Sequence, residues 1–310
     1  MTEYLKLNEN DIRQILRKYD LKLSEYKFIE EGSGNTNFVV NTSENRYILT
    51  IFEIGHIRTK KLSKLLNLLE QYDFPSSGIQ RSSNGNQIIS IQGKAALLKL
   101  YVVGEVKEHL DENMLYQVGA SIARLNIIPS PDYLPDHHAY GLETFSRVLE
   151  NEINEEYENW IREKYVYLKK SIPSGLPHGL IHGDVFIDNV LFEGENFKAL
   201  IDFEEACHYY LVFDLGMAIV GTCIEDSKIE LPKVRSLVRG YQSIRKLERM
   251  EKETLQLFVE YAAIATSSWR FWKYNIDTPI GELSQRYLEM VGIAKAVNTV
   301  SAEKFMKEVF

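Results

Sequence analysis

The stretch from residue 178 to residue 205 reads HGLIHGDVFIDNVLFEGENFKALIDFEE. Residues 180–181 are a short apolar run, which predicts a buried strand that leads into an irregular loop. Two more apolar runs, 190–192 and 199–201, are joined by the polar segment 193–196, whose Gly and Asn residues favour a turn. The pattern therefore predicts a β-hairpin with an irregular loop at its open end.

Three polar side chains lie at the open end of this hairpin. Asp184 is in the preceding loop, Asn189 stands where the first strand starts, and Asp202 stands where the second strand stops. We therefore expect the three to converge on one point. Phosphoryl transfer needs a carboxylate that takes the proton of the attacking hydroxyl, and oxygen ligands that hold magnesium on the phosphates. Asp184 is the candidate catalytic base, and Asn189 and Asp202 are the candidate metal ligands.

Asp and Asn residues in loops often only cap turns. Here His182 and the apolar runs on both sides favour a catalytic site over that alternative. The pattern H-x-D-x-x-x-x-N followed by I-D-F resembles the catalytic and metal-binding loops of the protein-kinase-like fold. With Gly183 between the His and the Asp, and Phe203-Glu204 after the second Asp, it looks like the aminoglycoside phosphotransferase and choline kinase branch.

This resemblance implies an α+β, two-lobed protein-kinase-like fold with ATP and Mg²⁺ as cofactors. A small antiparallel five-stranded N-lobe is expected over residues 1–103, and a mainly helical C-lobe over residues 104–310. The sequence agrees, because a capped amphipathic helix that begins near Asn8 precedes a series of apolar runs. The expected strands include residues 26–28, 38–40, 47–52, 88–91 and 95–100, with a helix over residues 58–72.

The turn GSGNTN at 32–37 lies where the resemblance places a loop that covers the nucleotide. Small residues let backbone N–H groups approach phosphates, and Ser, Thr and Asn side chains add donors. An ordinary Gly- and Asn-rich hairpin turn is the alternative explanation. The candidate nucleotide-binding residues in this turn are Ser33, Gly34, Asn35, Thr36 and Asn37. Further on, Leu100 and Val102 lie in the expected hinge, whose backbone groups would bond an adenine ring.

The sequence departs from the kinase-like pattern on the third strand. Most such enzymes carry a Lys there, which holds the phosphates and pairs with a Glu on the next helix. Here the matching residue in YILTIFE is Thr50, which we include among the nucleotide-binding candidates. The helix that follows presents Lys60, Lys61 and Lys64 and no acidic residue before Glu70. One of these lysines could supply the missing charge, although a solvated basic face is the alternative.

The second half of the chain has a helical character. Apolar periodicity predicts helices over residues 113–126, 143–170 and 255–274. Asp214 stands at the start of an apolar helix, where we expect an N-cap, and the resemblance implies that it supports the catalytic loop. His137 and His138 lie in a Pro-rich loop without a metal-binding pattern, so we expect them to be exposed and assign them no role.

Composition limits the classes of function. The chain has 310 residues, of which 45% are hydrophobic and 26% charged, and its net charge is −8. These values are typical of a folded globular protein and argue against a general nucleic-acid binder. The only two cysteines, Cys207 and Cys223, suggest no disulfide framework. The first residues lack a signal-peptide pattern and no apolar run is long enough for a bilayer, so we expect a cytoplasmic protein without a membrane partner.

Several strings resemble the bacterial homoserine kinases of the kinase-like type. They are GNTNF at 34–38, YILTIFE at 47–53, IDFEEACHYYLVFDL at 201–215 and the segment GYQSIRKLERMEKETLQLF with the SWRFW that follows it. The resemblance implies transfer of the γ-phosphate of ATP to the hydroxyl of L-homoserine, a step of threonine biosynthesis, by a monomer or homodimer. It also implies that Arg270, within SWRFW, grips the carboxylate of the substrate.

Other acceptors stay open at this point. Choline or ethanolamine, aminoglycosides and thiosugars are alternatives within the same chemistry. A nucleotide-binding pseudokinase is the alternative outside catalysis, because the third strand carries Thr50 and the helix lacks its Glu. Arg270 has a plainer alternative too, in which its stem packs on the neighbouring aromatic residues and its head meets a surface carboxylate.

Overall fold

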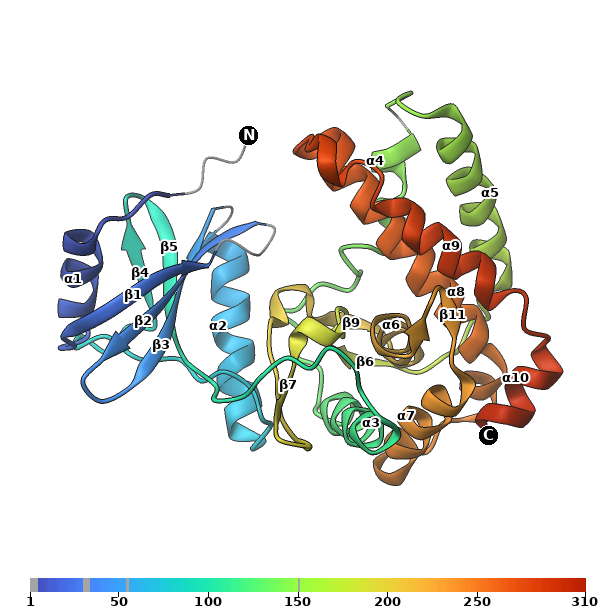
Figure 1. Ribbon diagram of the computed structural model, residues 1–310, viewed down its shortest axis with the longest axis horizontal. Coiled ribbons are helices and arrows are strands. Elements are labelled where there is room, and N and C mark those ends of the chain that lie inside the picture. The colour runs from blue at the N-terminus through green and yellow to red at the C-terminus, as the bar shows by residue number, and fades with distance from the viewer. Residues whose placement is uncertain (1–4, 30–33, 54–55, 150) are drawn as a thin grey trace. The chain divides into compact units, whose positions relative to one another are not determined.

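The computed structural model describes residues 5–29, 34–53, 56–149 and 151–310. The chain divides into two compact units (Figure 1). The first, which we call the N unit, comprises Met1–Gly104 and Lys198–Glu204; the second, the C unit, comprises Glu105–Phe197 and Glu205–Phe310. The segment Lys198–Glu204, which the sequence places in the second lobe, thus groups with the N unit.

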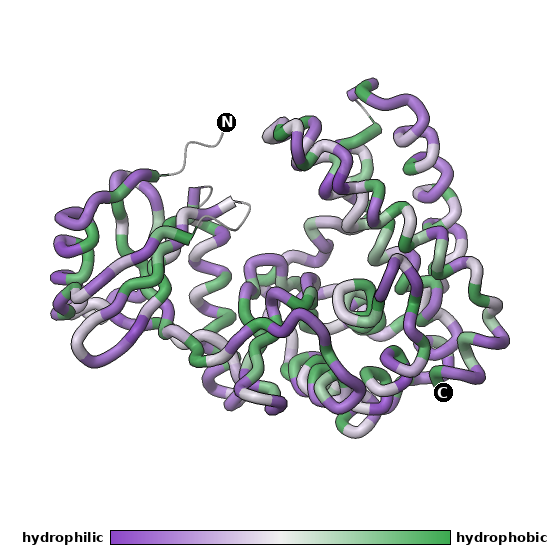
Figure 2. The backbone as a smooth tube through the Cα atoms, in the orientation of Figure 1, coloured by the Kyte–Doolittle hydropathy of each residue, from purple (hydrophilic) through white to green (hydrophobic). Residues whose placement is uncertain are grey.

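The N unit is built on a five-stranded sheet in which every neighbouring pair is antiparallel. Its strands are β1 (Leu23–Ile29), β2 (Asn35–Thr42), β3 (Arg46–Phe52), β4 (Ile88–Ile91) and β5 (Lys94–Leu100), in the order β1-β2-β3-β5-β4. The expected five-stranded antiparallel sheet is therefore confirmed. Its hydrophobic residues gather along the strands, while the N-terminal helix alternates hydrophobic and hydrophilic positions (Figure 2).

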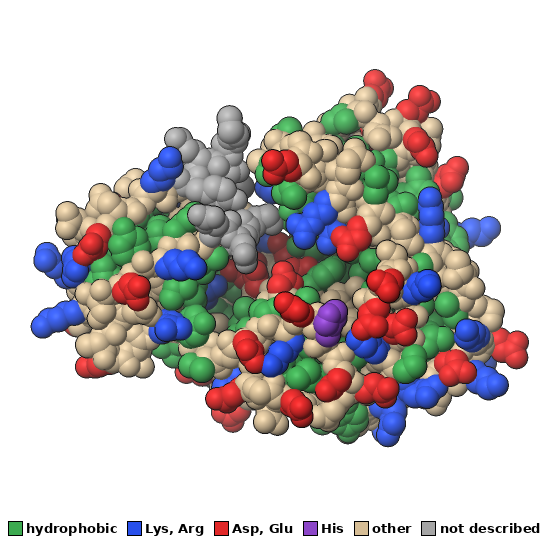
Figure 3. Space-filling view, in the orientation of Figure 1, with side chains coloured by type: hydrophobic (Ala, Val, Ile, Leu, Met, Phe, Trp, Pro, Cys, Tyr) green, Lys and Arg blue, Asp and Glu red, His purple; other side chains and the backbone are tan. Residues whose placement is uncertain are grey.

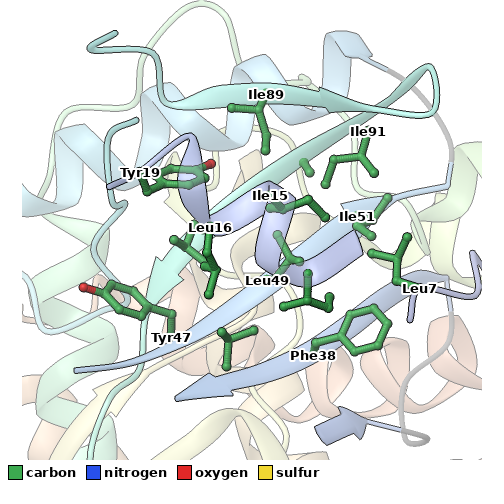
Figure 4. Packing of buried hydrophobic residues seen from close by; sticks show 14 of the residues in the cluster. Leu7, Ile15, Leu16, Tyr19, Phe38, Tyr47, Leu49, Ile51, Ile89 and Ile91 are labelled. Atoms are coloured by element: carbon green, nitrogen blue, oxygen red, sulfur yellow. The ribbon is translucent and has the colours of Figure 1, made fainter. Parts of the chain in front are cut away.

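One face of this sheet is covered by helix α1 (Glu9–Arg17). Asn8 caps the helix through the N–H of Asp11, and the Asp11 side chain accepts the N–H of Asn8 in return, a complete capping box. The apolar side of α1 packs on the sheet because its hydrophobic residues recur at helical spacing. Figure 4 shows this core, which includes Leu7, Ile15, Leu16, Tyr19, Phe38, Tyr47, Leu49, Ile51, Ile89 and Ile91.

The opposite face of the sheet carries Thr50, one of the residues predicted to bind the nucleotide. Successive side chains of a strand point to opposite faces, so Ile48, Thr50 and Phe52 share the face that α1 does not cover. Helix α2 (His56–Gln71) contributes Leu62 and Leu66 to a small pocket, which strand β5 and the residues after β8 also line. We call this side of the sheet the α2 face.

The C unit is mainly helical, as expected. Its helices are α3 (Glu112–Asn126), α4 (Ser146–Leu149), α5 (Glu155–Ser171), α6 (Leu211–Thr222), α7 (Leu231–Ile244), α8 (Arg249–Trp272), α9 (Tyr287–Val297) and α10 (Ala302–Val309), with the 3₁₀ turns η1 (Leu142–Thr144), η2 (Ile187–Asn189), η3 (Phe203–Glu205) and η5 (Gly281–Leu283) and the π-helical turn η4 (Lys273–Asp277). The short strands are β6 (His178–Ile181), β7 (Val190–Glu193), β8 (Asn196–Leu200), β9 (Cys207–Tyr210), β10 (Ile224–Glu225) and β11 (Lys228–Ile229). η3 and β8 lie where the chain passes between the two units.

The expected continuous helix over residues 143–170 is wrong. The structure has η1, α4 and α5 in that span, with a break before α5. Asn154 causes part of the break, because its side chain accepts the N–H of Tyr157 and caps α5 from an extended backbone conformation. Glu152 adds a positive φ of 52°, which a continuous helix does not contain.

Short paired strands lie on both sides of the loop that contains Asp184. β7 and β8 form the expected hairpin as a two-stranded sheet, and β6 pairs with β9 from Ile181–Cys207 to His178–Tyr210. Helix α6 follows β9 directly and is buried almost throughout, which fits its nearly continuous apolar sequence. In the part of the chain that the structure describes, no helix is long and apolar enough to cross a membrane. Figure 3 shows acidic and basic side chains intermixed over the face drawn.

Candidate active site

The loop after β6 is held by the carboxylate of Asp214. Asp214 Oδ2 accepts the N–H of His182 at 3.0 Å, and its Oδ1 accepts the N–H of Gly183 at 2.8 Å. Burial raises the pKa of Asp214, while the charge of His182 and these N–H bonds oppose the rise. The expectation that Asp214 is the N-cap of its helix is wrong, because α6 begins at Leu211 and Asp214 lies in its first turn. Its side chain supports the loop that leads to Asp184 instead.

Asn126, at the end of α3, continues this support. Its Nδ2 donates to the carbonyl oxygen of Leu180 at 3.0 Å and to Asp214 Oδ2 at 3.2 Å, and its Oδ1 accepts the hydroxyl of Tyr241 at 2.8 Å. These groups are buried, and a buried polar atom without a hydrogen bond would carry a desolvation penalty. The bonds of Asn126 avoid that penalty. Sequence reasoning missed Asn126 and Tyr241, since their partners are distant in the chain.

Gly183 is required by the shape of the loop. Its φ of +82° lies in the left-handed region, which favours glycine. A Cβ atom built there would lie 2.6 Å from His138 Nε2 and 3.0 Å from the carbonyl oxygen of Glu205. Any side chain would therefore push the loop away from its neighbours.

His138 is the residue that fills the space beside Gly183, and the expectation that it is exposed is wrong. It is completely buried, with Nε2 3.0 Å from the carbonyl oxygen of Gly183 and Nδ1 accepting the N–H of Tyr140. Burial lowers the pKa of His138 to about 3, so the ring is neutral. Since Nδ1 accepts, Nε2 carries the proton and donates to Gly183. His137, in contrast, is exposed as expected.

Asp184 and Asn189 are brought together in the C unit. Asn189 lies in η2, and its Nδ2 donates to the carbonyl oxygen of Asp184 at 2.8 Å and to Asp184 Oδ2 at 3.3 Å. Burial raises the pKa of Asp184 to about 8, and the negative charges of Glu205 and Asp188 add to the rise. The hydrogen bond from Asn189 and the positive charge of Arg270 oppose it. This is the kind of carboxyl that can exchange a proton near neutral pH.

Arg270 comes from the last turn of α8. Its Nη1 donates to Glu289 Oε2 at 2.6 Å and to the carbonyl oxygen of Arg286 at 3.2 Å. The Arg270 side chain is only 12% exposed, whereas the Glu289 side chain is 54% exposed. The ion pair matches the plainer alternative for this residue, while its charge still acts on Asp184. The predicted role of Arg270 in gripping an acceptor therefore stays a prediction.

Asp202, the third member of the predicted constellation, belongs to the N unit. It follows β8 and has a φ of 65°, a left-handed conformation that Asp adopts more readily than most residues. Backbone strain of this kind is often found at functional sites. Asp202 stays a predicted metal ligand. Its convergence with Asp184 and Asn189 also stays a prediction.

The residues predicted to bind the nucleotide phosphates lie on β2 and β3. Asn35 pairs with Phe52 and Asn37 pairs with Thr50, so both Asn residues share the α2 face with Thr50. The side chain of Thr36 points to the opposite face, where its hydroxyl donates to Glu53 and accepts the N–H of Leu5. That hydroxyl is engaged within the N unit. Gly34 has a φ of +135°, and Ser33 lies outside the described residues.

The expected hinge leads out of β5. The N–H of Leu100 donates to the carbonyl oxygen of Gly78 at 2.8 Å, and the next N–H, that of Tyr101, donates to Arg46. Val102 lies in the following segment, which has no regular secondary structure. The Leu100 N–H is therefore already bonded, and Val102 remains the better candidate for an adenine contact.

The donor set fits magnesium. The Nδ2 of Asn189 is used on Asp184, which leaves the side-chain oxygen as its possible ligand atom. Asp202 adds a carboxylate, and Mg²⁺ prefers oxygen ligands, of which one or two carboxylates and the substrate phosphates often suffice. Within the described ranges, no three His, Cys, Asp or Glu side chains gather into a site that could hold a metal ion. The proposed site uses only one carboxylate ligand and one amide ligand.

The sequence matches the phosphotransferase enzyme family (APH) over residues 25–247. It is 28% identical to the homoserine kinase of Agrobacterium fabrum over 296 aligned positions, which cover 91% of both chains. It is 29% identical to the homoserine kinase of Chelativorans sp. over 318 aligned positions, which cover 97% of this chain and 98% of that protein.

A solved structure shares the fold. The amicoumacin kinase hAmiN, solved with AMP-PNP and Ca²⁺, superposes with a TM-score of 0.74 at 14% sequence identity, over 96% of this chain and 95% of that chain. This likeness confirms the expected α+β, kinase-like fold.

Proposed function

Because the chain belongs to the phosphotransferase enzyme family, it is a small-molecule kinase that acts on a hydroxyl group, and we propose that it phosphorylates L-homoserine with ATP. The observation that carries the choice of substrate is the match to homoserine kinases over more than nine tenths of both chains. In the proposed reaction the homoserine hydroxyl oxygen bonds the γ-phosphorus, the bond from that phosphorus to the β–γ bridging oxygen breaks, and ADP leaves.

Asp184 accepts the proton of the attacking hydroxyl in this proposal. Its position supports the role, because Asn189 fixes it from one side and Asp214 fixes the two residues before it. A base with a pKa of about 8 holds the proton well once it has been transferred. The ammonium group of a bound amino acid would lower this pKa and favour the ionised carboxylate before the attack.

Asn189 and Asp202 would hold Mg²⁺, which neutralises charge on the β- and γ-phosphates when it is bound. Asn35, Asn37 and Thr50 would line the phosphate end of the nucleotide from the α2 face. Kinase-like enzymes of this family bind ATP. The residues named here as binding it are part of our proposal.

The acceptor is a zwitterion, so its pocket needs charges of both signs. Arg270 would bind the carboxylate, and its guanidinium has donors beyond the Nη1 that contacts Glu289. Glu205 and Asp188 act electrostatically on Asp184 and supply the negative environment that an ammonium group prefers. Both observations support an amino-acid acceptor. Choline and aminoglycosides lack the carboxylate and would leave Arg270 without a partner from the substrate.

The test is ADP release in a coupled assay with L-homoserine, choline, ethanolamine, an aminoglycoside and a thiosugar. L-Homoserine should give the highest kcat/KM, and phosphorus NMR should show a phosphate monoester on its side chain. Strong activity on choline with none on homoserine would contradict the acceptor. Nucleotide binding without ADP release from any acceptor would favour the non-catalytic alternative.

A cytoplasmic location and a monomeric or homodimeric state complete the proposal. Size-exclusion chromatography with light scattering would measure the oligomeric state, and cell fractionation would locate the protein.

A further inference from the structure

A chain of hydrogen bonds in the C unit leads from the end of α7 to the loop that precedes Asp184. It begins at Arg245, the C-cap residue of α7, whose side chain is 15% exposed. Arg245 Nη1 donates to the hydroxyl of Tyr241 at 3.0 Å, and that hydroxyl donates to Asn126 Oδ1 at 2.8 Å. The Nδ2 of Asn126 in turn donates to Asp214 Oδ2 at 3.2 Å. The chain therefore joins α7, α3 and α6 through four side chains.

The direction of each bond in this chain is fixed by its two ends. A guanidinium group only donates, so the Tyr241 oxygen accepts from Arg245 and its single proton goes to Asn126. Burial raises the pKa of Tyr241, which keeps that proton on the hydroxyl. With its oxygen occupied, the Asn126 amide directs its N–H groups to Asp214 and to the carbonyl oxygen of Leu180. The Tyr241 hydroxyl thus sets the orientation of the amide that bonds the Asp214 carboxylate.

Arg245 is itself held by Glu251, in the first turn of α8. Its Nη1 and Nη2 donate to Oε1 and Oε2 of Glu251 at 2.9 and 3.0 Å, a two-pronged ion pair. The Glu251 side chain is completely buried, and its Oε2 also accepts the N–H of Glu248. A buried carboxylate depends on its cation, because an unpaired charge away from water is costly. This ion pair therefore fixes the guanidinium that donates to Tyr241.

Two glycines allow α3 and α7 to approach closely enough for the chain to form. A Cβ atom built on Gly240, the neighbour of Tyr241, would lie 1.9 Å from the carbonyl oxygen of Tyr116 on α3. A Cβ atom built on Gly119 would lie 1.9 Å from the carbonyl oxygen of Leu237 on α7. The backbones of the two helices are thus in direct contact, which places the buried hydroxyl of Tyr241 against α3.

We infer that Tyr241 and Arg245 are positioning residues for phosphoryl transfer. They orient the Asn126 amide, and this amide supports the Asp214 carboxylate, which holds the loop that ends at Asp184. When the chain is broken, the loop loosens and the proposed base is less well placed for the hydroxyl of the acceptor. The inference rests on the role given to Asp184 under the proposed function. Since neither residue binds a substrate in that proposal, their loss should change kcat and leave both KM values in place.

Tyr241→Phe removes only the hydroxyl, and Tyr157→Phe is its matched control. Tyr157 is also buried, and its hydroxyl lies 2.8 Å from that of Ser267. That bond joins α5 to α8 and is not part of the chain that reaches Asp214. Both variants lose a buried hydroxyl, so the melting temperature should fall in each. A difference in activity between them therefore reports on the chain and not on stability.

The first measurement is steady-state kinetics with L-homoserine and ATP. Tyr241→Phe should lower kcat by about five-fold or more, with both KM values within about two-fold of wild type. Tyr157→Phe should keep the kcat of wild type. Arg245→Lys keeps a charge beside Glu251 but loses the planar fork that spans Glu251 and Tyr241, so its kcat should also fall. Combining it with Tyr241→Phe should cost no further kcat, since Arg245 acts through the Tyr241 hydroxyl.

The second measurement is amide hydrogen exchange, which needs no substrate. The N–H groups of His182 and Gly183 should exchange about five-fold faster in Tyr241→Phe than in Tyr157→Phe. An unchanged kcat in Tyr241→Phe, a loss confined to KM, or exchange equal to the control would overturn the inference. If Tyr241→Phe does not fold, Arg245→Lys takes its place in both measurements. A wild-type chain that phosphorylates no acceptor would contradict the proposed function, and the exchange rates would still decide whether the chain holds the loop.

Discussion

The side-chain amide of Asn189 donates to Asp184 twice, at 2.8 Å to its carbonyl oxygen and at 3.3 Å to its carboxylate. These two bonds fix the segment between Asp184 and Asn189 as a turn. The turn begins at Gly183 and His182, whose N–H groups are fixed by Asp214. A carboxylate that is held at both ends, as the proposed base is, loses little conformational entropy when the substrate arrives.

Replacing Asp184 by Asn should abolish turnover and leave nucleotide affinity nearly intact. The base is needed only when the hydroxyl attacks, so kcat falls while ADP binding, measured by calorimetry, stays close to wild type. The variant should also melt no lower than wild type, because burial already disfavours the charged form of this group. Near wild-type kcat would show that Asp184 is not the base.

Asp202→Ala should weaken binding of Mg·ATP, since the change removes a charged metal ligand. The measurement is nucleotide affinity as a function of Mg²⁺ concentration. We expect the curve to shift to higher Mg²⁺ by about ten-fold or more. A Mg²⁺ dependence like that of wild type would count against Asp202 as a ligand.

Arg270→Lys keeps the positive charge but loses the planar fork that grips a carboxylate with two hydrogen bonds. The KM for L-homoserine should rise about ten-fold or more, or about 1.4 kcal/mol, with little change in the KM for ATP. Glu289→Gln is the matched control, because it removes the resting partner of Arg270 and leaves the guanidinium in place. An equal loss for ATP would argue against the assignment.

Gly183→Ala should destabilise the chain far more than Gly194→Ala. Both glycines have a positive φ, 82° and 62°, so both variants incur the left-handed penalty of about 1 kcal/mol. Only at Gly183 does the new methyl group meet neighbours, with His138 at 2.6 Å, which adds about 1–3 kcal/mol. Urea unfolding of both variants measures the difference. Equal destabilisation would mean that the loop shifts without cost.

His138 should make stability depend on pH below neutrality. Its pKa is about 3 in the folded chain and 6.5 in the unfolded chain, so the unfolded state binds more protons between these values. The contribution of the neutral His138 ring to the free energy of unfolding is fully present above pH 6.5. It falls as the pH drops, by about 2 kcal/mol at pH 5. His138→Gln should flatten this slope in urea unfolding, and His137→Gln, at the exposed neighbour, should not. A slope that survives in His138→Gln would assign it to other groups.

The contact between Asp184 and Asn189 could be predicted from sequence because it is local. Asp184 and Asn189 are five residues apart, and one turn of 3₁₀ helix is enough to bring them into contact. The five strands of the N unit could also be predicted, since alternation of apolar and polar residues indicates a half-buried strand. The break before α5 was not, because the capping bond of Asn154 outweighs the apolar periodicity around it.

The residues that support the site were decided by tertiary structure alone. His138 and Asn126 carry no motif, and each acts on a partner that lies far away in sequence, Gly183 and Asp214. Sequence alone predicts which side chains carry the chemistry, because proton transfer and metal binding require particular functional groups at short spacing. Which buried groups hold those side chains depends on packing, because a buried hydrogen bond forms wherever the folded chain brings a donor to an acceptor.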